Sequence, residues 1–111
     1  MKKLNEYIIE KLKINNSVNK NKEKFDGNFN NLDRKIIRPM LEEYGYYYMS
    51  DYDTDFNENL KVFSILYNNQ PDRNTVEEIT LDIINDKRFP KYKDIKIEEE
   101  KTGIFIYIYF D

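Results

Sequence analysis

Cysteine, histidine and tryptophan are absent from this chain of 111 residues. Without cysteine or histidine there is no disulfide framework, zinc finger, thiolate nucleophile or Ser-His-Asp triad. Catalysis would have to rest on carboxylates, lysines, tyrosines and three serines, and no pair of these residues stands out as an acid and base couple. The sequence therefore predicts a protein that is not an enzyme, with no catalytic residue, bound metal or cofactor.

Long apolar runs are also missing, because no stretch approaches the roughly 18–20 residues that span a bilayer. The chain begins with Met1, Lys2 and Lys3, but Glu6 and Glu10 interrupt the apolar stretch that an export signal requires. We therefore expect a cytoplasmic protein that does not bind membranes. Alanine is absent while Asn and Ile are abundant, a bias typical of an AT-rich genome such as that of a low-GC bacterium or its phages.

The chain is acidic, with a formal net charge of −3. Dedicated nucleic-acid binders neutralise phosphates with a basic surface, so this charge argues against that class. A length of 111 residues with 40% hydrophobic content fits one domain.

Three segments divide the chain. The spacing of apolar residues predicts an amphipathic helix over 1–14. An Asn-rich and Lys-rich linker or loop follows over 15–31. Residues 32–111 hold the elements of a folded domain.

The sequence of the first half of this domain predicts one helix and one hairpin. Asp33 is a candidate helix N-cap, Gly45 is a good C-terminal stop, and Pro39 predicts a kink or a late start. A strand over 46–49, an acidic turn over 51–58 and a second strand over 60–67 follow.

In the second half, Thr75 and Glu78 have the spacing of a capping box, which predicts a helix over 75–88. The last hairpin is expected to turn at Thr102 and Gly103, with Ile97 opposite Ile108 and Ile95 opposite Phe110.

The predicted fold is therefore a small α+β domain. Two hairpins separated by one helix (ββαββ) form a four-stranded, mainly antiparallel sheet, with N-terminal helices beside it. The helix over 75–88 should cover the aliphatic face of the last hairpin. Its other face carries Phe105, Tyr107 and Tyr109, which the N-terminal helices, a second copy of the chain or a partner would cover.

Two charged segments suggest binding sites. Asp51, Asp53 and Asp55 alternate like the start of an EF-hand loop, but Phe56 and Val62 occupy positions that need Gly and Glu. The acidic segment is instead expected to be a solvated loop or, with its neighbouring tyrosines, a surface that binds a basic protein.

The segment over 87–93 mixes lysines and an arginine with Phe89 and Tyr92, which is the chemistry of phosphate contact and base stacking. A basic helix C-terminus also complements the helix dipole, so this segment needs no ligand to explain it.

Met1-Lys2, Glu6-Tyr7-Ile8 and Glu10 resemble the capsid-targeting leader of internal head proteins in T-even-like phages. The resemblance covers about a tenth of the chain and implies cleavage after Glu10. A helix packed on the domain is the alternative for these residues.

These observations favour a protein-binding module, encoded by a phage or mobile element, that inhibits a host defence protein. The alternatives are a structural or packaged phage protein and a homo-oligomeric bacterial protein. The residues expected to contact a host protein or a second copy of the chain are Tyr46, Tyr48, Asp51, Tyr52, Asp53, Asp55, Phe105, Tyr107 and Tyr109.

Overall fold

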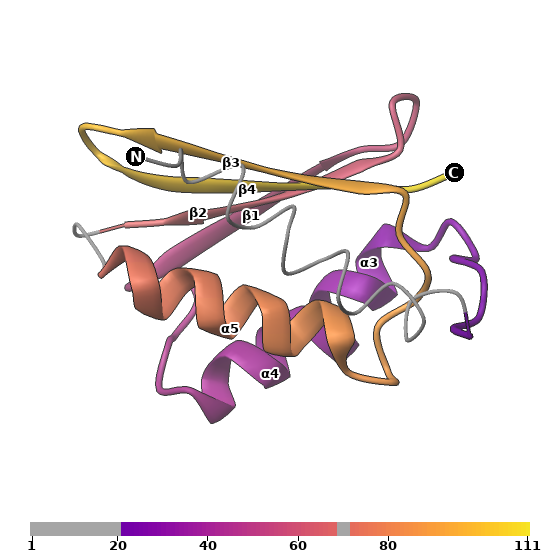
Figure 1. The fold of residues 1–111 in the computed structure, drawn as a ribbon, viewed down its shortest axis with the longest axis horizontal. Helices are drawn as coiled ribbons and strands as arrows, with labels where there is room; N and C mark the ends of the chain where they lie inside the picture. The colour runs from indigo at the N-terminus through magenta and orange to yellow at the C-terminus, as the bar shows by residue number, and fades with distance from the viewer. Residues whose placement is uncertain (1–20, 69–71) are drawn as a thin grey trace.

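A four-stranded sheet lies on a layer of helices in the computed structural model, which describes residues 21–68 and 72–111 (Figure 1). The elements in chain order are the α-helix α3 (Phe29–Asn31), the π-helix η1 (Leu32–Ile37), α4 (Arg38–Glu43), β1 (Tyr52–Asn57), β2 (Val62–Tyr67), α5 (Arg73–Asn85), β3 (Asp94–Glu100) and β4 (Gly103–Tyr109). The strand order is β1-β2-β4-β3 with every neighbouring pair antiparallel. The predicted α+β class and four-stranded antiparallel sheet are confirmed.

The first helical segment runs without a break from α3 through η1 into α4. Its N-cap is Asn28, whose side chain accepts a hydrogen bond from the Asn31 N–H at 3.0 Å, so the prediction of Asp33 as the cap is wrong. Pro39 does not break the helix. A proline in an α-helix clashes with the carbonyl four residues earlier, and here the wider π turns of η1 come just before it.

Gly45 ends this helical segment as predicted. Its φ is +83°, and the N–H groups of Gly45 and Tyr46 donate to the carbonyls of Glu42 and Leu41, which is a Schellman motif.

The first hairpin differs from the prediction. Residues 46–49 are not a strand, and the acidic segment expected to be a turn contains β1. The reason is a period of two: Tyr52, Thr54 and Phe56 point to the core side, while Asp53 and Asp55 point to solvent. The second strand agrees, with Phe63, Ile65 and Tyr67 buried on one face.

Helix α5 begins earlier than the capping box predicted. Asp72 is the N-cap, and its carboxylate accepts bonds from the backbone N–H and hydroxyl of Thr75 at 3.2 and 2.7 Å. These hydrogen bonds hold the pKa of the Asp72 carboxyl below its usual value.

The last hairpin has the predicted faces but a different register. Ile97 lies opposite Ile106 and Ile95 lies opposite Ile108, so the turn is Lys101 and Thr102. A shift of two residues keeps each side chain on its face. Gly103 belongs to β4, where its Cα lies so close to the carbonyl oxygen of Tyr67 that a Cβ would not fit.

The core lies between the inner face of the sheet and the helices. As predicted, α5 covers the aliphatic face (Figure 1), where the isoleucines of β3 and β4 are buried with Val76, Ile83 and Ile84 of the helix. Phenylalanines fill one end of the core, with the rings of Phe29 and Phe56 stacked at 5.1 Å.

The predicted helix over 1–14 lies outside the described residues. Of the predicted linker over 15–31, residues 29–31 form α3, and residue 24 makes an isolated bridge to Lys91. Phe25 packs against the core and Phe29 is buried in it, so the packed domain includes residues before 32.

Candidate functional site

An uninterrupted run of exposed apolar side chains follows α4. Tyr47, Tyr48 and Met49 are 54%, 36% and 77% exposed. They belong to residues 44–51, which we call the tyrosine loop and which lead from the helices to the edge of the sheet (Figure 1). Runs of exposed apolar residues are unusual on a folded domain unless the surface binds something. The tyrosine loop is therefore the leading candidate site.

Hydrogen bonds fix the backbone of the tyrosine loop. The N–H of Asp51 donates to the carbonyl of Tyr47 at 2.9 Å, and the N–H of Tyr47 donates to the Asp51 carboxylate at 2.8 Å. Met49 donates to the carbonyl of Tyr52 at 2.8 Å and has a φ of 72°. A residue with a side chain in this region costs about 1–3 kcal/mol, so the loop holds Met49 outward at the expense of stability.

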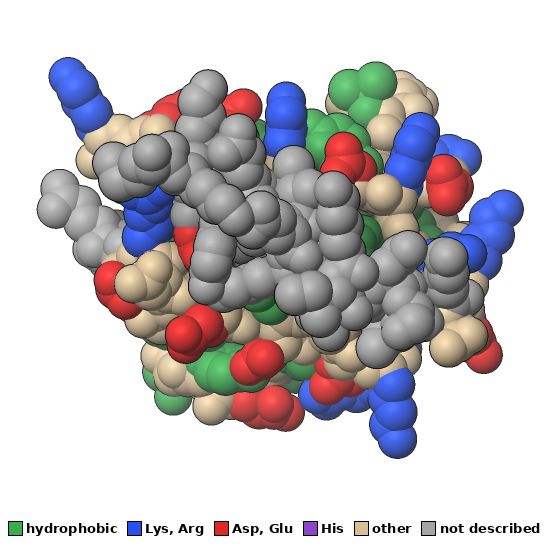
Figure 2. Space-filling model, in the orientation of Figure 1, with side chains coloured by type: hydrophobic (Ala, Val, Ile, Leu, Met, Phe, Trp, Pro, Cys, Tyr) green, Lys and Arg blue, Asp and Glu red, His purple; other side chains and the backbone are tan. Residues whose placement is uncertain are grey.

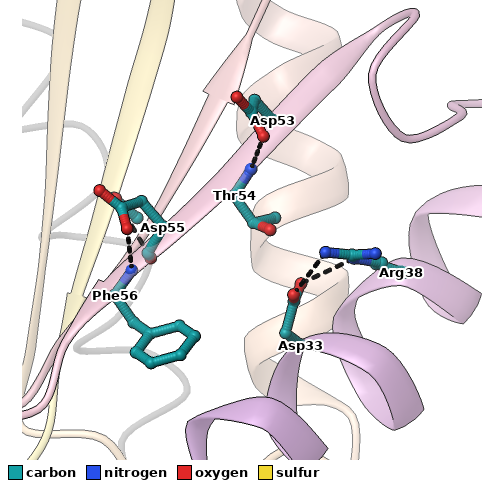
Figure 3. A network of polar contacts seen from close by, with 7 residues as sticks. Asp33, Arg38, Asp53, Thr54, Asp55 and Phe56 are labelled. Carbon is teal, nitrogen blue, oxygen red and sulfur yellow. Dashed lines mark hydrogen bonds and ion pairs between the residues drawn. The ribbon is translucent and has the colours of Figure 1, made fainter.

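Tyr48 is also held from the helical layer. Its ring lies 3.6 Å from the guanidinium carbon of Arg38, a cation–π contact. Arg38 in turn makes a two-pronged salt bridge to Asp33, with Nε to Oδ1 at 3.1 Å and a terminal nitrogen to Oδ2 at 2.7 Å (Figure 3). Asp33 is buried, so this pair is partly shielded from water. The ion pair therefore positions the ring of Tyr48.

The acidic side chains of β1 protect the edge of the sheet. The carboxylates of Asp53 and Asp55 accept hydrogen bonds from the next N–H in the chain, those of Thr54 and Phe56, each at 2.9 Å (Figure 3). Because β1 is an edge strand, alternate N–H groups point away from β2 and are open to another strand. The two aspartates occupy these donors and place negative charge along the edge.

Substitution at these two positions separates charge from hydrogen bonding. Asp53→Asn with Asp55→Asn should leave the mass in solution unchanged, because an amide oxygen accepts the same N–H bonds. Asp53→Ala with Asp55→Ala frees both N–H groups, and we expect this variant to self-associate in light scattering. If both double variants keep the mass of the wild type, the aspartates do not protect the edge; if both self-associate, their charge protects it and their hydrogen bonds do not.

The remaining predicted tyrosines are less accessible. Tyr52 is 1% exposed and belongs to the core, and burial raises its pKa to about 12. Its ring therefore cannot form part of the predicted contact surface. Tyr46 is half-buried with its ring 5.9 Å from that of Tyr67, and burial, followed by the charges of Asp51 and Asp72, raises its pKa.

Sequence reasoning missed Tyr44, Tyr47, Met49 and Arg38. Tyr44 donates a hydrogen bond to Asp82 of α5 at 2.6 Å, and this bond raises its pKa to about 12. A strand over 46–49 would have buried alternate residues of this run. Three tyrosines followed by a methionine show no alternation of apolar and polar residues, which was the signal against a strand.

Phe105, Tyr107 and Tyr109 lie on the outer face of the sheet, away from the helices. The register places Asp53, Leu66, Phe105 and Glu98 in one row across the four strands. The next row is Asp55, Ser64, Tyr107 and Lys96.

The aromatic rings of this outer face are half-buried, and those of Phe105 and Tyr107 stack at 5.9 Å. Burial and then the charges of Glu98 and Glu100 raise the pKa of Tyr107. The structure thus joins the predicted acidic residues of β1 to this aromatic stripe on one face, while Tyr46, Tyr48 and Asp51 lie in the tyrosine loop.

The basic segment over 87–93 does not present aromatic rings to solvent. Phe89 and Tyr92 are buried, so neither can stack on a base, and the base-stacking interpretation is wrong. The guanidinium of Arg88 donates hydrogen bonds to both carboxylate oxygens of Asp86, at 2.9 and 3.0 Å. This hydrogen bonding lowers the pKa of Asp86 to about 2.

Within residues 21–68 and 72–111, no three Asp or Glu side chains gather as metal ligands. None of the helices in the same residues is long and apolar enough to cross a membrane. Comparison of the chain with models of protein families, with curated proteins and with solved structures gives no match.

Proposed function

We propose that the protein is a non-enzymatic binding module that attaches to a basic surface of another protein through the tyrosine loop and the acidic edge of β1. One observation carries the proposal: Tyr47, Tyr48 and Met49 form an exposed apolar run that hydrogen bonds and the Asp33–Arg38 ion pair hold in place. Tyrosine is enriched among residues that dominate binding energy, and a preordered loop loses little entropy on binding.

The negative charge around the tyrosine loop indicates a partner with a basic surface. Residues 39–60 contain six carboxylates and no Lys or Arg. Figure 2 shows acidic side chains beside hydrophobic ones at the lower left of the molecule, where α4 and the start of β1 lie in Figure 1, and Lys or Arg side chains at the lower right. Such a surface attracts a basic partner and speeds its association. An inhibitor from a phage or mobile element that occupies the basic surface of a host defence protein would have these properties.

The experiment compares two exposed apolar sites on one scaffold. The double variant Tyr47→Ser with Met49→Ser changes the tyrosine loop, while Leu60→Ser changes an equally exposed residue, 70% accessible, in the turn between β1 and β2. A partner retained by the wild type from a bacterial lysate is identified, purified and titrated with each variant.

We expect the loop variant to weaken binding by about tenfold or more and Leu60→Ser to have little effect. Asp53→Asn with Asp55→Asn should slow association and reduce its dependence on salt. Failure of the wild type to bind any basic protein, or equal effects of the loop variant and Leu60→Ser, would contradict the proposal.

The outer face of the sheet gives the second candidate, self-assembly through the stacked rings of Phe105 and Tyr107. Light scattering over a concentration series, with Tyr107→Lys beside the wild type, distinguishes it. A dimer that this substitution splits into folded monomers would favour a structural protein over an inhibitor.

A further inference from the structure

A cavity of about 630 Å³ opens between the segment 21–28 and the loop that follows α5. Its volume lies within the range of roughly 300–1,000 Å³ that small-molecule sites occupy. It shares no lining residue with the tyrosine loop or the outer face of the sheet. The proposed protein-binding function therefore does not use it.

Two separated parts of the chain are joined around this cavity. The N–H of Lys91 donates to the carbonyl of Glu23 at 2.8 Å, and the ammonium group of Lys22 donates to the carbonyl of Ile84 near the end of α5. Phe25 packs on Phe110, with ring centroids 4.4 Å apart. The wall formed by residues 21–28 is thus anchored to the core at several points.

Positive charge exceeds negative charge around the cavity. Lys22, Lys24, Lys87 and Arg88 line it, against the carboxylates of Glu23 and Asp26. Arg88 is neutralised by Asp86, and Lys22 is committed to its carbonyl partner. In the part of the chain that the structure describes, no ion pair engages the ammonium groups of Lys24 or Lys87. These two cations, one from each of the two joined segments, can bind an anion.

Lys22, which also lines the cavity, is partly buried and has its contacts within the protein. Its ammonium lies 5.2 Å from the ring centroid of Phe89 and 5.8 Å from that of Tyr92. Burial lowers its pKa to about 8, although the charge of Asp86 acts in the other direction. An anion in the cavity would stabilise the charged form of this lysine.

Apolar side chains also line the cavity. Phe25, Ile36 and Pro90 are each half-buried and line the cavity, so part of their surface faces it. Apolar walls with a few charged groups are typical of sites that hold a small molecule by its body and orient it by its charge.

We propose that this cavity binds a small molecule that carries an anionic group on an apolar body. Lys24 and Lys87 pair with the anion, and Phe25 and Ile36 contact the body. A phosphate and a carboxylate share this chemistry, so the test includes one probe of each kind.

The probes are adenosine 5′-monophosphate, benzoate, adenosine and inorganic phosphate, titrated by calorimetry into the full chain. We expect at least one of the two aromatic anions to bind with a Kd below about 1 mM, and adenosine and phosphate to bind more weakly. Binding of the monophosphate alone assigns the anion as a phosphate, and binding of benzoate alone assigns a carboxylate.

Lys24→Gln with Lys87→Gln should raise the Kd by about tenfold, because each charged hydrogen bond is lost while most of the side-chain length is kept. Lys101→Gln, in the exposed turn between β3 and β4, is the matched control and should bind like the wild type. The proposal is overturned if neither aromatic anion binds, if adenosine binds as tightly as its monophosphate, or if the double variant keeps full affinity. Thermal unfolding checks that both variants remain folded.

Discussion

Gly103→Ala is expected to destabilise the domain by about 3 kcal/mol or more, because a Cβ at this position would overlap the carbonyl oxygen of Tyr67. That oxygen belongs to the neighbouring strand, so it cannot move aside as a flexible side chain would. Leu66 also approaches the same point, with its Cδ1 at 3.1 Å. Urea unfolding followed by fluorescence of the tyrosines measures the change in the free energy of unfolding.

Gly45→Ala is the matched control for this effect. Gly45 has a φ of +83°, but no atom lies within 4 Å of the point that a Cβ would occupy. An alanine there is strained in its backbone but overlaps no neighbouring atom. We expect a loss of about 1 kcal/mol. Similar losses for the two variants would mean that β4 moves to accommodate the new methyl group, and that close approach to Tyr67 is not what requires glycine.

The same glycine shows why the sequence predicted the faces of the last hairpin but not its register. Alternation of isoleucines with tyrosines determines which residues share a face, and a shift of two residues leaves that unchanged. Thr102 and Gly103 look like a turn when only local conformation is considered. The need for glycine arises from Tyr67, which belongs to another strand, so no local pattern could reveal it.

The sequence predicts a turn in place of strand β1 for a different reason. Asp53 and Asp55 are rare in strands and common in turns, and they outweighed the alternation of Tyr52, Thr54 and Phe56. At an edge strand the penalty falls, because their carboxylates bind N–H groups that have no partner strand. The period of two was the correct signal.

The part of the candidate site that depends on Arg38 could not be predicted from the sequence. Asp33 and Arg38 are five residues apart, and pairs on an ordinary α-helix meet at separations of three or four. The π-helix η1 changes this spacing, because the Arg38 N–H donates to the Asp33 carbonyl five residues earlier and the two side chains form a salt bridge. Pro39 indicated an irregular helix, but not which irregularity.

Arg38→Met should destabilise the domain by about 3 kcal/mol, because it leaves the Asp33 carboxylate buried without a partner. Arg38→Lys should recover only part of this loss, since an ammonium cannot make both hydrogen bonds or stack on Tyr48. Both variants also free the ring of Tyr48. Affinity for the partner should therefore fall further than for variants that change stability alone, with Gly103→Ala, which lies outside the tyrosine loop, as the comparison.

The double variant Asp33→Leu with Arg38→Met separates the two contributions of the ion pair. Removing both charges leaves no buried carboxylate, so most of the stability lost in Arg38→Met should return. Tyr48 still lacks its cation, so the affinity should stay low. If stability and affinity recover together, the pair acts only on folding, and the tyrosine loop would not need Arg38 to bind. If stability recovers while affinity stays low, the ion pair positions the tyrosine loop for binding, which the geometry of Asp33, Arg38 and Tyr48 supports.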